Sequence, residues 1–170
     1  NDGDIPGSWF HGSLTGEYAT DAYAHLTIPV QINTSAGSTG AWMVRYWADF
    51  DLEGGTWDNF EIQISSDNIS WHRMSPVGGI PGPNGLTVAG RTIMEDSGGW
   101  VEVAHPFPSS FTVPSNGSFM MRVIVETDQM PSSGYGGTID PPEGVFIDDM
   151  SITRTQGSMT DILWSENFTN

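Results

Sequence analysis

The stretch Asn59–Ser65 reads NFEIQIS, and its side chains alternate between apolar and polar along its length. Phe60, Ile62 and Ile64 fall on one side, and polar side chains fall on the other. Successive side chains of a β-strand point to opposite faces, so this pattern predicts a strand with one buried face. The surrounding chain is therefore expected to build a sheet that covers a core.

The same alternation recurs elsewhere in the chain. Ala41–Phe50 places large apolar side chains on one face, and Ser118–Thr127 is apolar on both faces, which predicts a central strand. Further strands are predicted at Ala24–Gln31, Gly99–Ala104, Gly144–Arg154 and Asp161–Ser165. The 21 Gly and 11 Pro separate these runs, and no stretch has a convincing helical period. The sequence therefore predicts an all-β sandwich or barrel.

The composition excludes several classes of function. The chain has 170 residues, enough for one domain with a real core, and carries 21 acidic residues against five arginines and no lysine. A net charge of −16 argues against a nucleic-acid partner, because such proteins bind phosphates through cationic side chains. Without cysteine there is no disulfide, zinc thiolate site or cysteine nucleophile. No apolar run is long enough for membrane insertion.

The two ends of the sequence suggest where the protein works and how it is divided. The chain begins at Asn1 without Met or an apolar signal segment, as expected of a processed piece of an exported protein, although a cloned fragment would look the same. We therefore expect an extracellular or cell-surface location. A sandwich is expected over residues 1–154, with a C-terminal extension over residues 155–170. Its final strand either packs on the same domain or pairs with a neighbouring molecule, building a homo-oligomer or polymer.

The most acidic segment, ADFDLEGGTWDNFE at Ala48–Glu61, predicts a calcium loop. Its carboxylates flank Gly54 and Gly55, and calcium is bound by several oxygen ligands on loops that glycine allows to turn sharply. An EF-hand is rejected because its twelfth position would be Phe60, and because the flanks read as strands. The alternative is an acidic, solvated hairpin tip.

A second acidic motif, GVFIDDMSI at Gly144–Ile152, lies inside a predicted strand. Strict alternation puts Asp148 on one face and Asp149 on the other, so one carboxylate shares a face with large apolar side chains. A buried carboxylate needs an arginine, backbone N–H groups or a metal ion. A metal or a backbone network is favoured over catalysis, and the alternative is an aspartate that caps a turn or pairs with arginine.

Four segments together resemble a known family. AYAHLTIPVQI (22–32), WMVRYWADFDLE (42–53), FEIQISSDNISW (60–71) and GVFIDDMSI (144–152) are similar, in this order, to motifs of jelly-roll β-sandwich modules. Such modules are attached to immune-inhibitor-A-like metallopeptidases and to many surface proteins of bacteria and archaea. They are related in architecture to MAM domains and carbohydrate-binding modules. The chain departs from the pattern at Asn68, where glycine is common, and in long insertions at 76–98 and 129–143.

The resemblance implies an antiparallel jelly-roll sandwich with an accessory role and with calcium as its cofactor. The metal ligands that it implies are Asp51, Glu53, Asp58, Asp148 and Asp149. Second-rank candidates for the same ion are Glu17, Asp21 and Asp140. The family supplies a fold and a role, but it does not supply a ligand other than the metal.

No catalytic motif stands out, so we predict that the protein is not an enzyme. The four histidines are scattered and form no His-Glu-x-x-His pair, and no Gly-x-Ser-x-Gly elbow occurs. Carboxylate pairs are expected by chance among 21 acidic residues, so they do not identify a catalytic site.

Aromatic side chains and glycosylation sequons predict two further properties of the surface. Seven tryptophans are many for one domain, and Trp57, Trp100 and Tyr135 are candidates for stacking on a polysaccharide. The alternative is that the tryptophans anchor the core. Four Asn-x-Ser/Thr sequons make Asn33, Asn68, Asn116 and Asn167 candidates for N-glycosylation.

The sequence thus predicts a non-catalytic, extracellular β-sandwich that calcium stabilises and that has a structural or adhesive role at the cell surface. One form of that role is a self-assembling subunit of a filament, a tube or a surface layer. The alternative is a carbohydrate-binding accessory module of a secreted hydrolase or peptidase.

Overall fold

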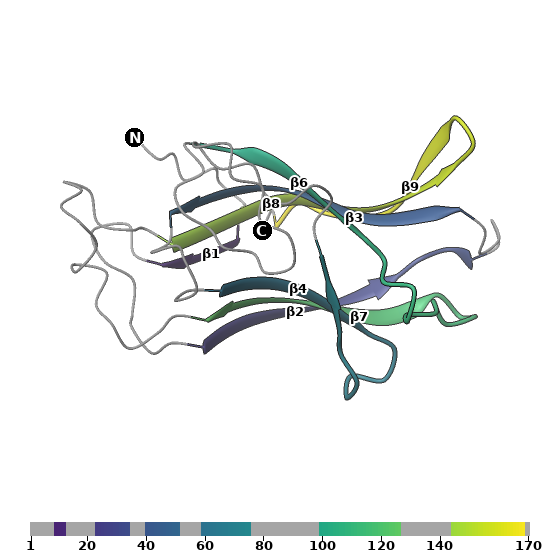
Figure 1. Ribbon diagram of the computed structural model, residues 1–170, viewed down its shortest axis with the longest axis horizontal. Helices are drawn as coiled ribbons and strands as arrows, with labels where there is room; N and C mark the ends of the chain where they lie inside the picture. Colours follow the sequence, from purple (N-terminus) through teal and green to yellow (C-terminus); the bar gives the residue numbers. More distant parts are fainter. Residues whose placement is uncertain are drawn as a thin grey trace.

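A computed structural model of the chain describes residues 9–12, 23–34, 40–51, 59–75, 99–126 and 144–168. These residues form nine strands in two antiparallel sheets that stack face to face (Figure 1). The predicted all-β sandwich is confirmed. Within the described ranges, no helix has the length and apolar character needed to cross a bilayer.

One sheet contains five strands. Its main order is β1 (Trp9–Gly12), β8 (Gly144–Gln156), β3 (Ala41–Asp51) and β6 (Val101–Pro106), and β9 (Met159–Glu166) also pairs with β8. Because β3 occupies one edge of β8 along most of its length, β1 and β9 share the other edge. The first and last described strands therefore lie end to end beside β8.

The other sheet contains four strands and includes the clearest prediction from the sequence. Its order is β2 (Tyr23–Gln31), β7 (Ser118–Glu126), β4 (Asn59–Ser65) and β5 (His72–Met74). Strand β4 has the predicted bounds, and Phe60, Ile62 and Ile64 have no exposed surface. The strand that is apolar on both faces, β7, is central as predicted, since it pairs with β2 and β4.

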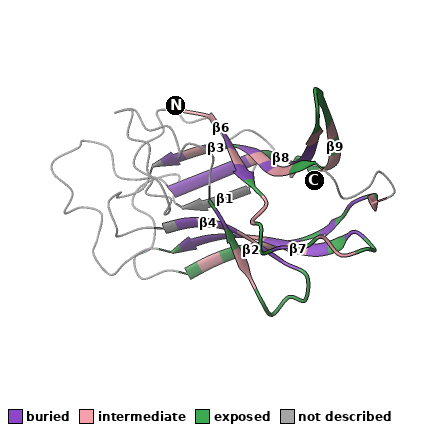
Figure 2. Ribbon diagram, turned by 45° about the vertical axis from the view of Figure 1, so that its right-hand side comes forward, coloured by how far each residue is buried: buried purple, intermediate pink, exposed green. Residues whose placement is uncertain are grey.

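The core lies between the sheets, where the apolar faces of their strands meet (Figure 2). The side chains of Val44, Tyr46, Ala48 and Phe50 on β3 are all buried there. Burying each of the larger apolar side chains contributes roughly 1.5–3 kcal/mol to the stability of the fold. The core therefore stabilises the sandwich without disulfides, which the sequence does not allow.

A β-bulge in β8 overturns the predicted alternation of GVFIDDMSI. Where β8 pairs with β3, Trp47 is opposite Asp148, and Arg45 is opposite Ser151, so one extra residue lies in β8. Asp149 adopts a φ of 49° at this point. The extra residue brings both Ile147 and Met150 onto the core face, and neither carboxylate lies there. The regular alternation assumed for this strand was wrong, because the bulge at Asp149 moves Met150 from the side of Phe146 and Asp148 to the core face.

The end of the chain folds back on β8 as a tight hairpin. Gln156 pairs with Met159, and Gly157 has a φ of 63° at the first central position, as glycine has in type II′ turns. Arg154 donates to Asp161 across the hairpin at 2.7 Å. In the described structure, the final strand thus pairs with its own chain.

Candidate functional site

The acidic loops join the sandwich at one end. Asp51 at the end of β3 pairs with Gly144 at the start of β8, while Tyr23 and Asn59 both pair with Glu126 at the end of β7. These strand ends all point to the left in Figure 1. Segments 13–22, 52–58 and 127–143 are attached at these ends, and Glu17, Asp21, Glu53, Asp58 and Asp140 lie in them, outside the described residues. We call this the acidic end.

The other predicted metal ligands lie away from that end. Asp148 is four residues along β8 from Gly144, the partner of Asp51, which is about 13 Å at 3.3 Å per residue. Asp148 is half-buried, and its Oδ1 accepts a hydrogen bond of 2.7 Å from the backbone N–H of Asp149, which is exposed. Among the described residues, no group of three or more histidine and acidic side chains is arranged to hold a metal ion.

The described sugar-stacking candidate is partly covered. Trp100 lies directly before β6, and its ring centroid is 6.4 Å from that of Phe146 on the outer face of the five-stranded sheet. Its exposure is intermediate. Trp57 and Tyr135 lie outside the described residues.

The four sequon asparagines are all exposed. Asn33, Asn68, Asn116 and Asn167 each lie outside the strands. Asn116 Oδ1 accepts a hydrogen bond from the N–H of Ser118, and Asn68 has a φ of 59°, a conformation that glycine adopts without strain. In the same turn, hydrogen bonds from the N–H groups of Ser70 and Ile69 lower the pKa of Asp67 to about 2.

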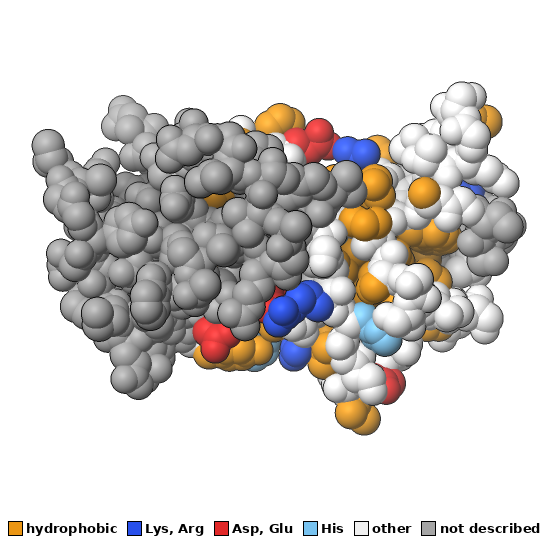
Figure 3. All heavy atoms as spheres, viewed as in Figure 1, with side chains coloured by type: hydrophobic (Ala, Val, Ile, Leu, Met, Phe, Trp, Pro, Cys, Tyr) orange, Lys and Arg blue, Asp and Glu red, His pale blue; other side chains and the backbone are white. Residues whose placement is uncertain are grey.

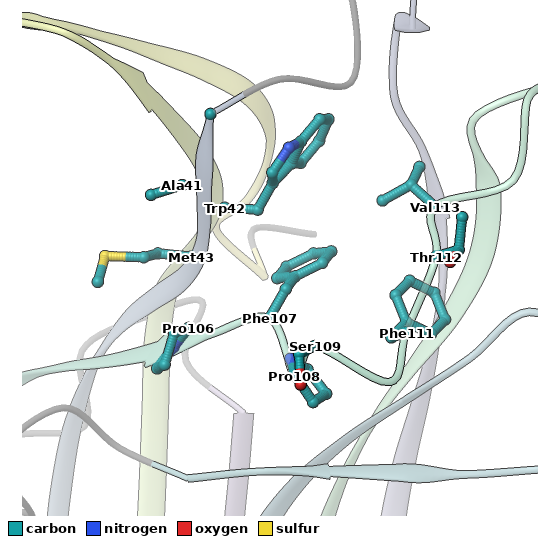
Figure 4. A pocket seen from close by; sticks show the side chains of 11 residues that line it. Ala41, Trp42, Met43, Pro106, Phe107, Pro108, Ser109, Phe111, Thr112 and Val113 are labelled. Atoms are coloured by element: carbon teal, nitrogen blue, oxygen red, sulfur yellow. The ribbon is translucent and has the colours of Figure 1, made fainter.

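A pocket opens at the opposite end of the sandwich from the acidic loops. It has a volume of about 480 Å³ and lies between the first residues of β3 and the segment that follows β6. Its lining comprises Gly40, Ala41, Trp42, Met43, Pro106, Phe107, Pro108, Ser109, Phe111, Thr112 and Val113. The view of Figure 4 places Trp42 and Phe107 on one side, and Phe111, Thr112 and Val113 on the other.

The pocket is continuous with an aromatic cluster that enters the core. The rings of Trp42 and Phe107 have centroids 5.8 Å apart, and Phe107 also contacts Phe111 and Phe119. The sequence placed Trp42 on the core face, but it gave no sign of Phe107 and Phe111, which lie in an irregular segment. The motif PFPSSF at 106–111 was the available signal, since it holds two aromatic residues and two prolines in six positions.

A buried polar group links the two sheets near this cluster. His105 on β6 approaches Tyr46 Oη on β3 at 2.8 Å through Nε2, and the carbonyl of Met74 on β5 at 3.2 Å through Nδ1. Because a carbonyl only accepts, Nδ1 carries the proton, and Nε2 accepts from the tyrosine hydroxyl. Burial lowers the pKa of His105 to about 4 and raises the pKa of Tyr46 well above its ordinary value. Both groups are neutral and serve the core.

Comparison with known proteins adds no relative. No family model matches the sequence, and no curated protein matches it. The resemblance to jelly-roll modules therefore stays a prediction.

Proposed function

We propose that this protein is a non-catalytic, extracellular jelly-roll β-sandwich with a structural or adhesive role at the cell surface, and that calcium at the acidic end stabilises it. The observation that carries the proposal is that the strand ends to which three acidic segments are attached lie at one end of the two sheets. Carboxylates that repel one another there would be neutralised by a divalent cation.

The strand order supports the jelly-roll part of the proposal. The orders β1-β8-β3-β6 and β2-β7-β4-β5 place the first four strands alternately in the two sheets. Strands β4 and β5 then form a hairpin within one sheet, and the return through β6, β7 and β8 alternates again. This nesting of strands is what two Greek keys wound together produce.

The described chemistry supports a role without catalysis. His105 is buried, and both of its nitrogens are engaged in the core. A general base must reach its substrate within hydrogen-bond distance, and this ring does not reach the surface.

Thermal unfolding with calcium and with EDTA tests the calcium proposal. A ligand that binds only the folded state at 100 times its Kd stabilises by about 2.7 kcal/mol. For a domain of this size, we expect calcium to raise the melting midpoint by roughly 5–10 °C. An unchanged midpoint would overturn the proposal.

Matched variants separate the acidic end from charge in general. We expect Asp51→Asn to reduce the calcium-dependent shift of the midpoint. Glu102→Gln removes one carboxylate from the exposed ion pair with Arg45 between β6 and β3, and it should leave that shift unchanged. Equal loss of the shift in both variants would mean that calcium acts by general screening.

A further inference from the structure

We propose that the pocket lined by Trp42, Phe107 and Thr112 is a binding site for a neutral sugar unit. The proposal goes beyond the structural role, because it gives the module a ligand at the end of the sandwich that faces away from the acidic loops. The site shares no residue with Trp57, Trp100 or Tyr135, which the sequence singled out for sugar stacking.

The size and the rings of the pocket fit one or two sugar residues. Its volume of about 480 Å³ lies within the range of small-molecule sites, about 300–1,000 Å³. The tilted rings of Trp42 and Phe107 form one wall (Figure 4). The C–H groups on one face of a pyranose ring are apolar, and they pack against aromatic rings of this kind.

The charges of the pocket favour a neutral ligand. None of its eleven lining residues is charged, while Ser109 and Thr112 are exposed and provide hydroxyl groups for hydrogen bonds. Two cations lie near the pocket, and both form ion pairs. Arg154, the β8 partner of Trp42, is bound to Asp161, and Arg45, whose guanidinium lies 3.6 Å from the sulfur of Met43, is bound to Glu102. Figure 3 shows one face of the molecule, and most of the described surface on its right-hand half is apolar or uncharged. An anionic ligand would therefore find no counter-charge, in a chain whose net charge is −16.

The backbone of the pocket favours a sugar over an extended peptide. Extended peptides bind chiefly through free backbone groups at a sheet edge. Here the N–H of Phe107 donates to the carbonyl of Trp42 at 2.9 Å, and the N–H of Phe111 donates to the carbonyl of Pro108 at 2.9 Å. Pro106 and Pro108 have no N–H group. The pocket thus offers ring faces and hydroxyls, which are the groups that recognise a saccharide.

NMR titration of the full chain tests the proposal. The probes are the neutral hexasaccharides cellohexaose, mannohexaose and chitohexaose, the anionic hexamer of galacturonic acid, and decaproline. We expect at least one neutral hexasaccharide to shift the indole N–H of Trp42 and the amides of Ser109 and Thr112, with no shift from the galacturonic acid hexamer. If no neutral hexasaccharide shifts these signals at millimolar concentration, the proposal is wrong. If only decaproline shifts them, the pocket is a peptide site and the proposal is also wrong.

Variants at exposed positions keep the test independent of folding. Trp42→Ala weakens the core as well as the site, so the decisive variant is Thr112→Arg, which puts a large cation into the pocket from an exposed position. We expect it to weaken binding of the neutral hexasaccharide at least tenfold. Ser115→Arg adds the same charge on the same connection outside the pocket, and it should leave binding within twofold. Equal affinity of Thr112→Arg and the unmodified chain would overturn the assignment.

The calcium proposal and the sugar proposal are tested independently of each other. The titration is repeated in EDTA, and because the pocket lies at the other end of the sandwich, binding should persist there. Loss of calcium stabilisation alone would leave the sugar site standing, and loss of sugar binding alone would leave the calcium site standing.

Discussion

His105 is held in its neutral form by the two sheets around it. Its ring stacks on Tyr46 with centroids 5.6 Å apart, and its nitrogens bond to that tyrosine and to the carbonyl of Met74. Protonation would place a hydrogen on Nε2, and the hydroxyl hydrogen of Tyr46 would then lose its acceptor. Burial of the ring disfavours its charged form and lowers the pKa of His105 from 6.5 to about 4, although the hydrogen bond to the carbonyl of Met74 acts in the opposite direction.

Acid is therefore expected to destabilise the protein through His105. The unfolded chain binds the proton near pH 6.5 and the folded chain only near pH 4, so stability is full above pH 6.5 and is lost as the pH falls toward 4. At 1.36 kcal/mol per pH unit, the loss amounts to about 3 kcal/mol. Urea unfolding at pH 7 and pH 4.5 measures it.

Two histidine variants show whether this residue is the cause. His105→Gln keeps an acceptor for Tyr46 and a donor for Met74 but does not titrate, so it should lose most of this pH dependence. His25→Gln, at an exposed position, should keep it. The same dependence in His105→Gln and in the unmodified chain would assign it to the carboxylates instead.

The burial of His105 could have been predicted from its neighbours. The sequence VEVAHP at 101–106 alternates, and places His105 on the same face as Val101 and Val103. Its two partners could not have been predicted, because Met74 lies 31 residues away and Tyr46 lies 59 residues away. Only the stacking of the sheets brings these groups together.

At the scale of strands, the bulge in β8 decides which face each residue occupies. Asp149 lies in the left-handed region, where β-branched residues are strained and glycine is not. We expect Asp149→Val to lower the free energy of unfolding by about 1–2 kcal/mol, and Asp149→Gly to leave it unchanged or raise it slightly. Urea unfolding in EDTA measures both variants without any contribution from a metal.

If β8 were regular at this position, Asp149→Val would be more stable than Asp149→Gly. Valine is favoured over glycine at an exposed position of a regular strand, by up to about 1 kcal/mol. A more stable Asp149→Val would therefore show that β8 is regular at this position. Because Asp149 is exposed, neither variant changes the packing of the core.

Strand length explains which elements the sequence could predict. Seven of the nine described strands were predicted within a few residues, and each of them has at least six residues in which to show alternation. The two that were missed, β1 and β5, have four and three residues. Strands this short form because β8 and β4 provide an edge with which they can pair. The signal for such a strand therefore lies in its partner and not in its own sequence.

At the scale of the whole molecule, charge is distributed unevenly. In the described residues, Arg45, Arg73 and Arg154 form ion pairs with Glu102, Glu61 and Asp161, and the guanidinium of Arg122 lies 3.9 Å from the ring centre of Trp71. Of the 18 other acidic residues, seven lie in segments 13–22, 52–58 and 127–143, which are attached at the acidic end. The sequence could predict Asp51, Glu53 and Asp58 as a group because these three residues are close together in the chain. The sequence could not predict the pocket, because its lining comes from residues 40–43 and 106–113, which are more than 60 residues apart.

The edge formed by β9 is the part of the surface suited to contact with a second copy. Strand β9 is an edge strand, and it carries Met159 and Ile162, with 68% and 70% of their surface exposed. Edge strands with exposed apolar residues pair with other strands unless they are blocked. We expect the protein to form concentration-dependent oligomers through β9, as measured by light scattering.

A pair of lysine variants tests that edge. Ile162→Lys should give a monomer, since a charge on the edge opposes strand pairing. Ile69→Lys, at an equally apolar position that is 83% exposed in the turn between β4 and β5, should still assemble. A strict monomer for the unmodified chain, with and without calcium, would rule out self-assembly through this strand.

The shared edge of β8 also determines how the domain would respond to mechanical force. Trp9 at the start of β1 lies opposite Ile147, and Glu166 at the end of β9 lies opposite Met150, so the two strand ends meet about 10 Å apart along β8. Polypeptide segments that continued from these two strand ends would leave the domain at neighbouring points. The sandwich would then lie beside the line of the chain and not within it. Tension along the chain would then peel two edge strands away one hydrogen bond at a time, and would leave the stacked sheets and their core unloaded.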